Sequence, residues 1–212
     1  MIGEKIDISK VSNQLLNDLV GIAERSKEVS PSTTVISFYG ESGSGKSVTA
    51  HALEHALEKR GHKVLLFQMD DYFKLPPKLN SQAREKDINH VGPQEVDLEL
   101  LDNLVLSLKN GQTSIKRPII NFIENTVSQE QVELDSPLDF VIVEGTYLYL
   151  LKNDDIKFFI ERTYQDTHVH RVSRMREPHT ELIQKALEIE HSIISVQSNR
   201  ANYIISKDFQ LK

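Results

Sequence analysis

The chain has 212 residues, the length of one ordinary domain, and a formal charge of −6 without a block of like charge. This balance argues against a broad nucleic-acid-binding surface and against a basic membrane-binding surface. Cysteine is absent, so disulfides and thiolate zinc sites are excluded. No apolar run approaches the roughly 18 residues of a membrane span, so a soluble, cytoplasmic protein is expected.

The predicted elements begin with an amphipathic helix over residues 11–29, whose inward face carries Val11, Leu15, Leu16, Leu19 and Ile22. We expect this N-terminal helical extension, residues 1–30, to pack within the domain rather than against a partner. A buried strand over 33–39, a glycine-rich loop, a helix over 46–59 and a second strand within 62–70 follow. That order implies a parallel strand pair with a right-handed crossover.

The second half of the chain continues the alternation of strands and helices. Residues 71–94 contain three prolines and few apolar positions, so they are predicted to be irregular. The pattern then predicts a helix over 94–111, a strand excursion or hairpin over 113–134, strands over 138–145 and 156–163, a helical region from about 166 to 200 interrupted near Pro178, and a last strand over 202–207. The fold class is therefore α/β, with a doubly wound parallel sheet.

The loop after the first strand, "GESGSGKS", fits the phosphate-loop spacing G-x-x-x-x-G-K-[ST] and has the required strand before it and helix after it. Glycines allow successive backbone N–H groups to point at phosphate oxygens, and the helix N-terminus adds partial positive charge. The sequence thus predicts a bound nucleoside triphosphate, held by Gly40, Glu41, Ser42, Gly43, Ser44, Gly45, Lys46, Ser47 and Val48.

Two acidic residues end predicted strands at the sheet edge where such folds bind ligands. Asp70 ends the second strand and is expected to accept the proton of an attacking hydroxyl, and it is also a candidate ligand of the metal. Glu144 ends the strand "FVIV" and is expected to hold Mg²⁺ together with Ser47. For Asp71, both a functional role and a role in orienting its loop stay open.

A basic segment, "HVHRVSRMREPH", is predicted to form a helical lid over about residues 166–180. Arg171 and Arg174 would share a helix face and stabilise charge on the transferring phosphoryl group. His51 and His55 lack the H-E-x-x-H pattern of a zinc site, and no third ligand is evident. His90 stays a candidate substrate-binding residue, because it lies in the irregular segment 71–94, where an acceptor could bind.

Further segments resemble the uridine kinase and phosphoribulokinase-like family of phosphate-loop kinases: "QMDDYFKLPP", "NHVGPQEVDLELL", "VIVEGTYLY" and "ANYIIS". The resemblance implies a phosphate-loop, nucleoside-kinase-like domain over residues 31–212 that uses ATP and Mg²⁺. It also implies that Asp70 acts as the base toward a sugar hydroxyl and that Tyr72 and Phe73 occupy the aromatic positions beside the substrate.

The acceptor positions depart from the family pattern. Val91 stands where the family has an aspartate that contacts ribose, and Ile120 and Asn125 stand where it has a tyrosine and a histidine that recognise the base. The triphosphate machinery therefore carries over, whereas acceptor specificity does not. His90, Asn121 and Asn125 would read a nucleoside differently or read a smaller hydroxylated metabolite. The candidate contacts for an anionic acceptor are Lys74, Lys78, Lys116 and Arg117.

The sequence therefore predicts an ATP-dependent small-molecule kinase that transfers the γ-phosphoryl group to a hydroxyl of a uridine- or cytidine-like nucleoside or a related metabolite. The expected partner is this acceptor, not nucleic acid or membrane, and homo-oligomerisation stays open. The alternative is a nucleotide-dependent switch or regulatory ATPase without a small acceptor. The N-K-x-D motif of GTPases and the L-S-G-G-Q motif of transporter ATPases are both absent.

Overall fold

The computed structural model describes residues 6–167 and 180–212. Within them, the helices are α1 (Asn13–Val29), α2 (Lys46–Lys59), α3 (Pro77–Lys86), α4 (Leu98–Lys109) and α6 (Glu181–Ile194). The strands are β1 (Thr34–Gly40), β2 (Val64–Gln68), β3 (Ser114–Asn121), β4 (Thr126–Glu133), β5 (Phe140–Gly145), β6 (Ile156–Ile160) and β7 (Tyr203–Ile205).

The central sheet has the strand order β2-β5-β1-β6-β7, and every neighbouring pair is parallel. Strands β1 and β5 are buried along their whole length, as continuous apolar runs between two helical layers should be. The chain moves to one side of β1 for β2 and β5 and to the other side for β6 and β7, so the order reverses at β1. This confirms the predicted α/β class, and folds of this class bind ligands beyond the carboxyl end of the strand at which the order reverses.

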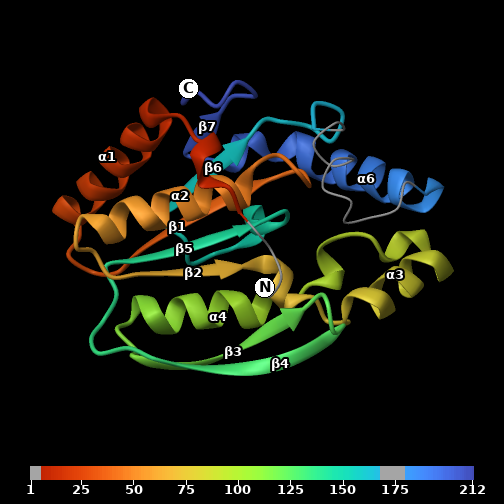
Figure 1. Ribbon diagram of the computed structural model, residues 1–212, viewed down its shortest axis with the longest axis horizontal. Helices are drawn as coiled ribbons and strands as arrows, with labels where there is room; N and C mark the ends of the chain where they lie inside the picture. The colour runs from red at the N-terminus through yellow and green to blue at the C-terminus, as the bar shows by residue number, and fades with distance from the viewer. Residues whose placement is uncertain (1–5, 168–179) are drawn as a thin grey trace.

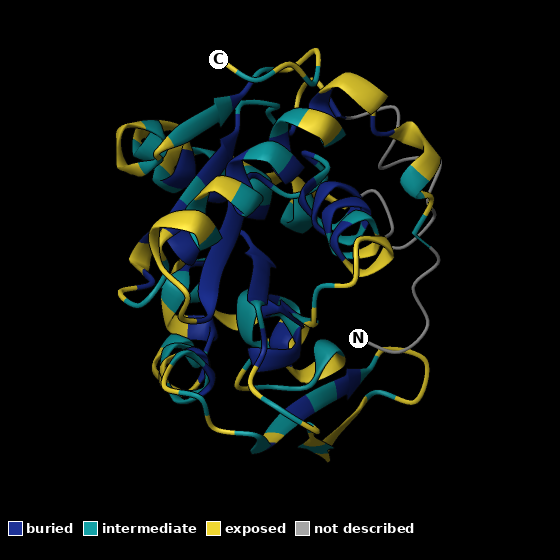
Figure 2. Ribbon diagram, turned by 90° about the vertical axis from the view of Figure 1, so that its left-hand side faces the viewer, coloured by how far each residue is buried: buried dark blue, intermediate teal, exposed yellow. Residues whose placement is uncertain are grey.

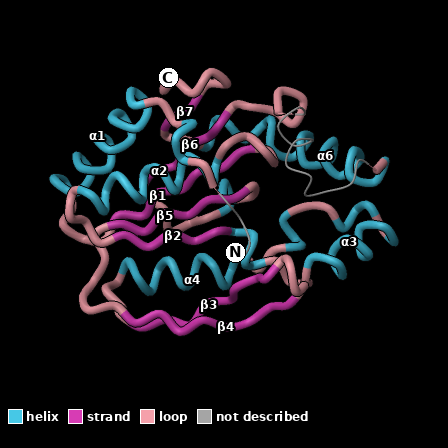
Figure 3. The backbone as a smooth tube through the Cα atoms, viewed as in Figure 1, coloured by secondary structure: helices cyan, strands magenta, loops and turns pink. Residues whose placement is uncertain are grey.

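Helices cover both faces of the sheet (Figure 1). Helices α1 and α2 pack on one face over Ile36, Phe38 and Ile142, whereas α4 and the β3–β4 hairpin lie on the other, over Val35 and Val141. Alternate residues of β1 and β5 therefore enter different cores. Figure 2 shows the buried strands between helices whose outer surfaces are exposed, and Figure 3 shows the hairpin beside α4.

Helix α1 belongs to the core, as predicted. Leu15, Leu19 and Ala23 are almost completely buried against the α2 side of the sheet. The Ser12 side chain accepts a hydrogen bond from the Leu15 N–H and so caps the first turn. Across the described ranges, no helix combines the length and the apolar character needed to cross a membrane.

The segment 113–134 is an antiparallel hairpin, with register from Ser114 opposite Glu133 to Asn121 opposite Thr126. The Asp71 carboxylate ties it to the main sheet, because its Oδ1 accepts a hydrogen bond of 2.8 Å from the Ile120 N–H. Asp71 therefore has a structural role in positioning the hairpin.

The prediction that residues 71–94 are irregular is wrong in part, because α3 occupies Pro77–Lys86. Proline lacks an N–H and fixes φ, so it is a poor residue inside a helix but a good one in its first turn. Pro77 begins α3 in this way, and Pro93 begins a short 3-10 helix, Pro93–Glu95. The prolines here start helices instead of preventing them.

The predicted helical region 166–200 contains α6, capped by the Thr180 side chain, and a 3-10 helix at Ser195–Arg200. Most of the predicted lid, including Arg171 and Arg174, lies outside the described residues.

Candidate active site

The phosphate loop joins β1 to α2 at the carboxyl edge of the sheet. Gly40, Gly43 and Gly45 have φ values of 153°, 80° and 107°, which other residues rarely adopt. At Gly40 a Cβ would lie 2.7 Å from the Ile160 carbonyl oxygen on β6. Glycine is therefore required here both for the backbone conformation and for close approach to the neighbouring strand.

Lys46 and Ser47 open α2 directly after the loop. Lys46 is buried, and its Nζ donates a hydrogen bond of 2.9 Å to the Glu41 carbonyl, so the ammonium group lies under the curve of the loop. The Ser47 hydroxyl donates to Glu144 Oε1 over 2.9 Å. The Ser44 hydroxyl is buried in the loop without a hydrogen-bond partner in the described structure. In loops of this geometry, phosphates bind at the backbone N–H groups and at the N-terminus of the helix that follows.

The structure brings Ser47 and Glu144 together as an oxygen-donor pair. Gln68 Nε2 also lies 3.4 Å from Glu144 Oε1, which fixes the carboxylate from the β2 side. A hydroxyl and a carboxylate suit Mg²⁺, which usually takes one or two protein oxygens and completes its shell with phosphate oxygens and water. No group of three or more His, Asp or Glu side chains with metal-ligand geometry occurs in the part of the chain that the structure describes. The residues therefore fit a magnesium ion shared with a triphosphate rather than an all-protein metal site.

Asp70 lies in the 3-10 helix Met69–Tyr72, two residues beyond Gln68, the last residue of β2. The register pairs Gln68 with Glu144, so Asp70 follows the strand end that adjoins the Glu144 carboxylate. Close packing holds this junction, because a Cβ on Gly145 would lie 2.2 Å from the Met69 Cβ. Asp70 is half-buried, while the adjoining Asp71 is buried.

Two predicted acceptor residues have side-chain oxygens that accept hydrogen bonds within the fold. The side-chain oxygen of Asn121 accepts from the N–H groups of Ile123 and Glu124, and that of Asn125 accepts from the Lys78 N–H. These contacts shape the hairpin turn and join it to α3.

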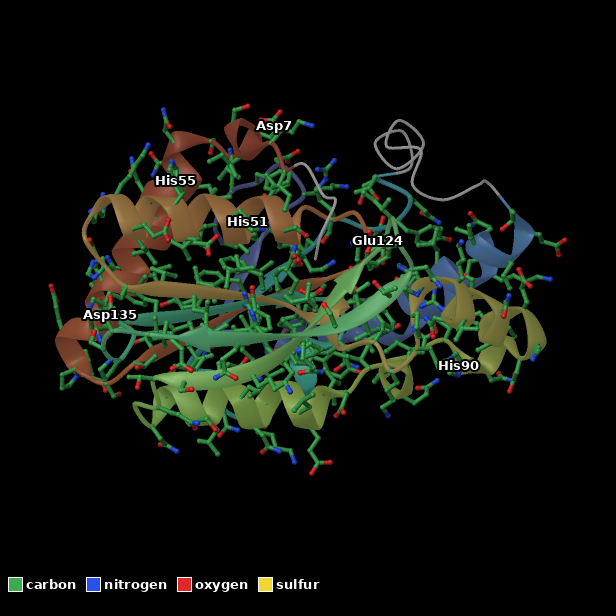
Figure 4. All side chains as sticks on the ribbon, turned by 60° about the horizontal axis from the view of Figure 1, so that its bottom comes forward. Asp7, His51, His55, His90, Glu124 and Asp135 are labelled. Carbon is green, nitrogen blue, oxygen red and sulfur yellow. The ribbon has the colours of Figure 1, made fainter. Side chains whose placement is uncertain are left out.

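The remaining predicted acceptor residues lie in the segment between β2 and α4. Tyr72 is buried with an unpartnered hydroxyl, and Phe73 forms an isolated bridge with Val96. His90 Nε2 lies 3.1 Å from Asn80 Oδ1. His51 and His55 lie along α2, well apart from His90 near α3 (Figure 4), so these histidines do not converge.

A buried ionic cluster beside the phosphate loop could not be recognised in the sequence. Arg84 on α3 donates two hydrogen bonds to Glu95, at 2.5 and 2.7 Å, and lies 4.0 Å from Glu190 on α6. Glu190 in turn accepts a hydrogen bond of 2.7 Å from the Ser42 hydroxyl. Burial opposes the Arg84 charge, but Glu95 and Glu190 outweigh it and raise its pKa.

Glu41 forms a second link between the loop and α6. Its Oε1 lies 2.7 Å from His191 Nδ1, and its Oε2 accepts a hydrogen bond of 2.7 Å from the Tyr164 N–H. The carboxylate is almost fully buried. Glu41 and Ser42, which the motif leaves unspecified, therefore anchor the loop to elements far along the chain.

The sheet is parallel, and its strand order reverses at β1. There, β1 is followed by a glycine loop with a buried lysine and a serine–glutamate pair. These features define a phosphate-loop nucleotide-binding protein. The sequence profile of the family described as "Phosphoribulokinase / Uridine kinase family" matches residues 35–161, more than half of the chain. The chain belongs to this family.

Two relatives illustrate the breadth of the similarity. A uridine kinase from Staphylococcus epidermidis is 33% identical over 136 residues, which cover 64% of this chain and 62% of that protein. The bifunctional alpha-galactosidase/sucrose kinase AgaSK from Mediterraneibacter gnavus is 27% identical over 188 residues, covering 82% of this chain but 20% of that protein. The chain thus matches less than two thirds of the length of either relative.

Among solved structures, a possible uridine kinase from Bacillus stearothermophilus superposes with a TM-score of 0.60 at 21% identity, covering 89% of this chain and 98% of that one. At this identity the likeness supports the fold.

Proposed function

We propose that this protein is an ATP-dependent small-molecule kinase that transfers the γ-phosphoryl group to a hydroxyl of a nucleoside or related metabolite. The observation that carries the proposal is the 2.9 Å contact between the Ser47 hydroxyl and Glu144, at the sheet edge where Asp70 follows the neighbouring strand. Phosphoryl transfer needs a held triphosphate, a metal position and a carboxylate for the attacking hydroxyl, and this edge offers residues for all three.

The chain's own residues have distinct roles in this reaction. The loop N–H groups and Lys46 bind the triphosphate and balance its negative charge. Asp70 orients the acceptor hydroxyl and takes its proton as the bond to phosphorus forms. Arg171 and Arg174 are proposed to hold charge on the transferring group, as the sequence pattern suggests.

Ser47 and Glu144 would hold Mg²⁺, which neutralises charge on the phosphate oxygens when it is bound. The Ser47–Glu144 hydrogen bond keeps both oxygens at one place, so little reorganisation is needed to receive a cation. The proposed phosphoryl donor is therefore ATP bound together with Mg²⁺.

Uridine and cytidine are the first acceptors to test, because the uridine kinase similarity covers most of the domain. A disaccharide or another sugar is the second, because the similarity to the sucrose kinase extends over more of this chain. Both acceptors offer a free hydroxyl to Asp70. We also propose a cytoplasmic location and, within residues 1–212, an N-terminal helical extension over residues 1–30 and a kinase domain over residues 31–212.

The test is release of ADP from Mg–ATP with each acceptor added singly, combined with identification of the phosphorylated product. The proposal expects one acceptor to raise ADP release well above the rate with ATP alone, with one phosphate ester formed per ADP. If no acceptor changes an ATP-only hydrolysis rate, a small acceptor is not part of the reaction.

A further inference from the structure

We propose that His191 is a positioning residue for the triphosphate: by holding the Glu41 carboxylate, it fixes the phosphate loop and the Lys46 ammonium group in the geometry that receives the β- and γ-phosphates. This inference rests on the proposed function and concerns the donor side of the same site. It follows from a chain of contacts that runs from α6 through Glu41 to Lys46.

Glu41 is an unexpected residue at its place in the loop. It occupies the first of the four positions that the motif leaves unspecified, and its side chain is only 4% exposed. A buried carboxylate loses the solvation of its charge, and a carboxylate close to a triphosphate repels it. A loop that binds phosphates can therefore contain this group only where fixed hydrogen-bond donors hold the carboxylate.

Both carboxylate oxygens of Glu41 have such donors. Oε2 accepts a hydrogen bond of 2.7 Å from the Tyr164 N–H, which lies beyond the end of β6. Oε1 lies 2.7 Å from His191 Nδ1, and because an ionised carboxylate can only accept, the hydrogen of this bond belongs to Nδ1. The Tyr164 donor is a backbone group that any residue except proline would provide. The His191 donor, in contrast, depends on the identity of the side chain.

The backbone of Glu41 forms the other end of the chain of contacts. Its carbonyl oxygen accepts a hydrogen bond of 3.1 Å from the Ser44 N–H and one of 2.9 Å from Lys46 Nζ. The side chain and the carbonyl group share one Cα, so a side chain that is fixed at both oxygens also limits rotation of the peptide that Lys46 contacts. Without the His191 donor, a buried carboxylate would lack a partner, and its movement toward water would displace this carbonyl.

Helix α6 is suited to hold the loop, because two of its consecutive residues contact two consecutive residues of the loop. Glu190 accepts a hydrogen bond of 2.7 Å from the Ser42 hydroxyl, next to the contact between His191 and Glu41. The His191 ring also packs edge-on against the Tyr164 ring, with centroids 5.5 Å apart. The His191 side chain is nevertheless 38% exposed, so its replacement should disturb the loop more than the core.

The deciding experiment measures ATP binding by calorimetry. His191→Leu removes the donor, whereas His191→Asn places an amide N–H as many bonds from Cα as Nδ1. We expect the ATP Kd to rise at least about tenfold in His191→Leu, the scale of a lost hydrogen bond to a charged group, and to stay within about threefold of the wild-type value in His191→Asn. His55→Leu, the same substitution at an exposed position of α2, should bind ATP like the wild type.

The possible results separate the inference from the proposed function. Wild-type ATP affinity in a folded His191→Leu protein overturns the inference and leaves the kinase proposal standing. An equal loss in His191→Leu and His191→Asn also overturns it, because the loss would then not depend on the Nδ1 donor. If the wild-type protein does not bind ATP, the proposed function and the inference fail together. If His191→Leu does not fold, His191→Gln replaces it, since its amide lies one carbon further from Cα and does not reproduce the Nδ1 position.

A double variant tests whether the effect passes through Glu41. In Glu41→Gln the charge that needs the donor is absent, so adding His191→Leu should raise the ATP Kd by less than about threefold. A rise of tenfold in this background as well would contradict the proposed route. With an acceptor that gives turnover, His191→Leu should raise the KM of ATP and leave the KM of the acceptor unchanged, a difference that a general loss of stability would not produce.

Discussion

Ser47 donates a hydrogen bond to Glu144 across 2.9 Å, although the two residues are 97 positions apart in the chain. Ser47 is the second residue of α2, the helix after β1, and Glu144 lies near the end of β5, the strand beside β1. The contact therefore depends on the parallel register of two neighbouring strands. It joins the phosphate loop to the carboxylate that would share its metal ion.

Removing either oxygen of this pair should weaken the use of magnesium. We expect Ser47→Ala and Glu144→Gln each to lower kcat by about 10²-fold and to raise the Mg²⁺ concentration at half-maximal rate. In the double variant, the increase in activation free energy should be smaller than the sum of the increases in the two single variants, because the two residues act together. Ser128→Ala on the hairpin serves as the control. Strictly additive losses in the double variant would show that the two oxygens serve separate functions.

Asp70→Asn tests the proposed base. It should lower kcat by 10²-fold or more, in the range of about 10²–10⁴ typical of general bases, while the ATP dissociation constant changes little. The matched variant is Asp71→Asn, which weakens the acceptor of the Ile120 N–H bond and should lower the melting temperature instead. Steady-state kinetics and ATP titration on both variants check this pair. Turnover in Asp70→Asn at the wild-type rate would remove Asp70 from the mechanism.

Lys46→Ala should weaken ATP binding and phosphoryl transfer together, because the lysine is buried beneath the loop and contributes the positive charge that the β- and γ-phosphates need. We expect the ATP dissociation constant to rise at least about tenfold, as loss of a charge-assisted contact usually costs 1.4 kcal/mol or more. Lys59→Ala, at the other end of α2 and exposed, is the control. A calorimetric titration in which both variants bind ATP like the wild type would contradict the assignment.

Gly45→Ala should damage the phosphate loop for two reasons. The residue has a φ of 107°, and its new Cβ would lie 2.6 Å from the Phe209 ring. Gly61→Ala is the control, because its φ is 88° but nothing lies within 4 Å of the added Cβ. We expect Gly61→Ala to show only the backbone cost of about 1 kcal/mol, and Gly45→Ala to lose more stability and ATP affinity as well. Equal melting temperatures for the two variants would show that contact with Phe209 is not costly.

Tyr147→Phe removes a buried hydroxyl that makes no hydrogen bond in the described structure. The melting temperature should stay unchanged or rise, because a buried hydroxyl without a partner is costly, and the KM of ATP should not change. Tyr203→Phe on β7, whose ring stacks on Phe158 in the core on the α1–α2 side of the sheet, is the control. A melting temperature that falls by several degrees in Tyr147→Phe would contradict the absence of a favourable contact at this hydroxyl.

The sequence predicted local features well, because they depend on neighbouring residues. The phosphate loop is defined by glycines at fixed spacing, and the buried strands by continuous apolar runs such as "FVIV". The exception is α3, where Pro76 and Pro77 were interpreted as breakers although Pro77 occupies a first-turn position that tolerates proline. A proline's effect depends on its place in a helix, and local sequence does not fix that place.

By itself, then, the sequence determined the α/β class, the loop that would hold a triphosphate and the acids at the carboxyl edge of the sheet, Asp70 just after β2 and Glu144 near the end of β5. Only the tertiary structure decided which distant side chains meet: Ser42 with Glu190, Glu41 with His191, and Arg84 with Glu95 and Glu190. The physical reason is that backbone geometry and apolar periodicity are encoded over a few residues. Pairing between polar side chains on α3, α6 and the loop requires all these elements to pack first, and no spacing in the sequence records it.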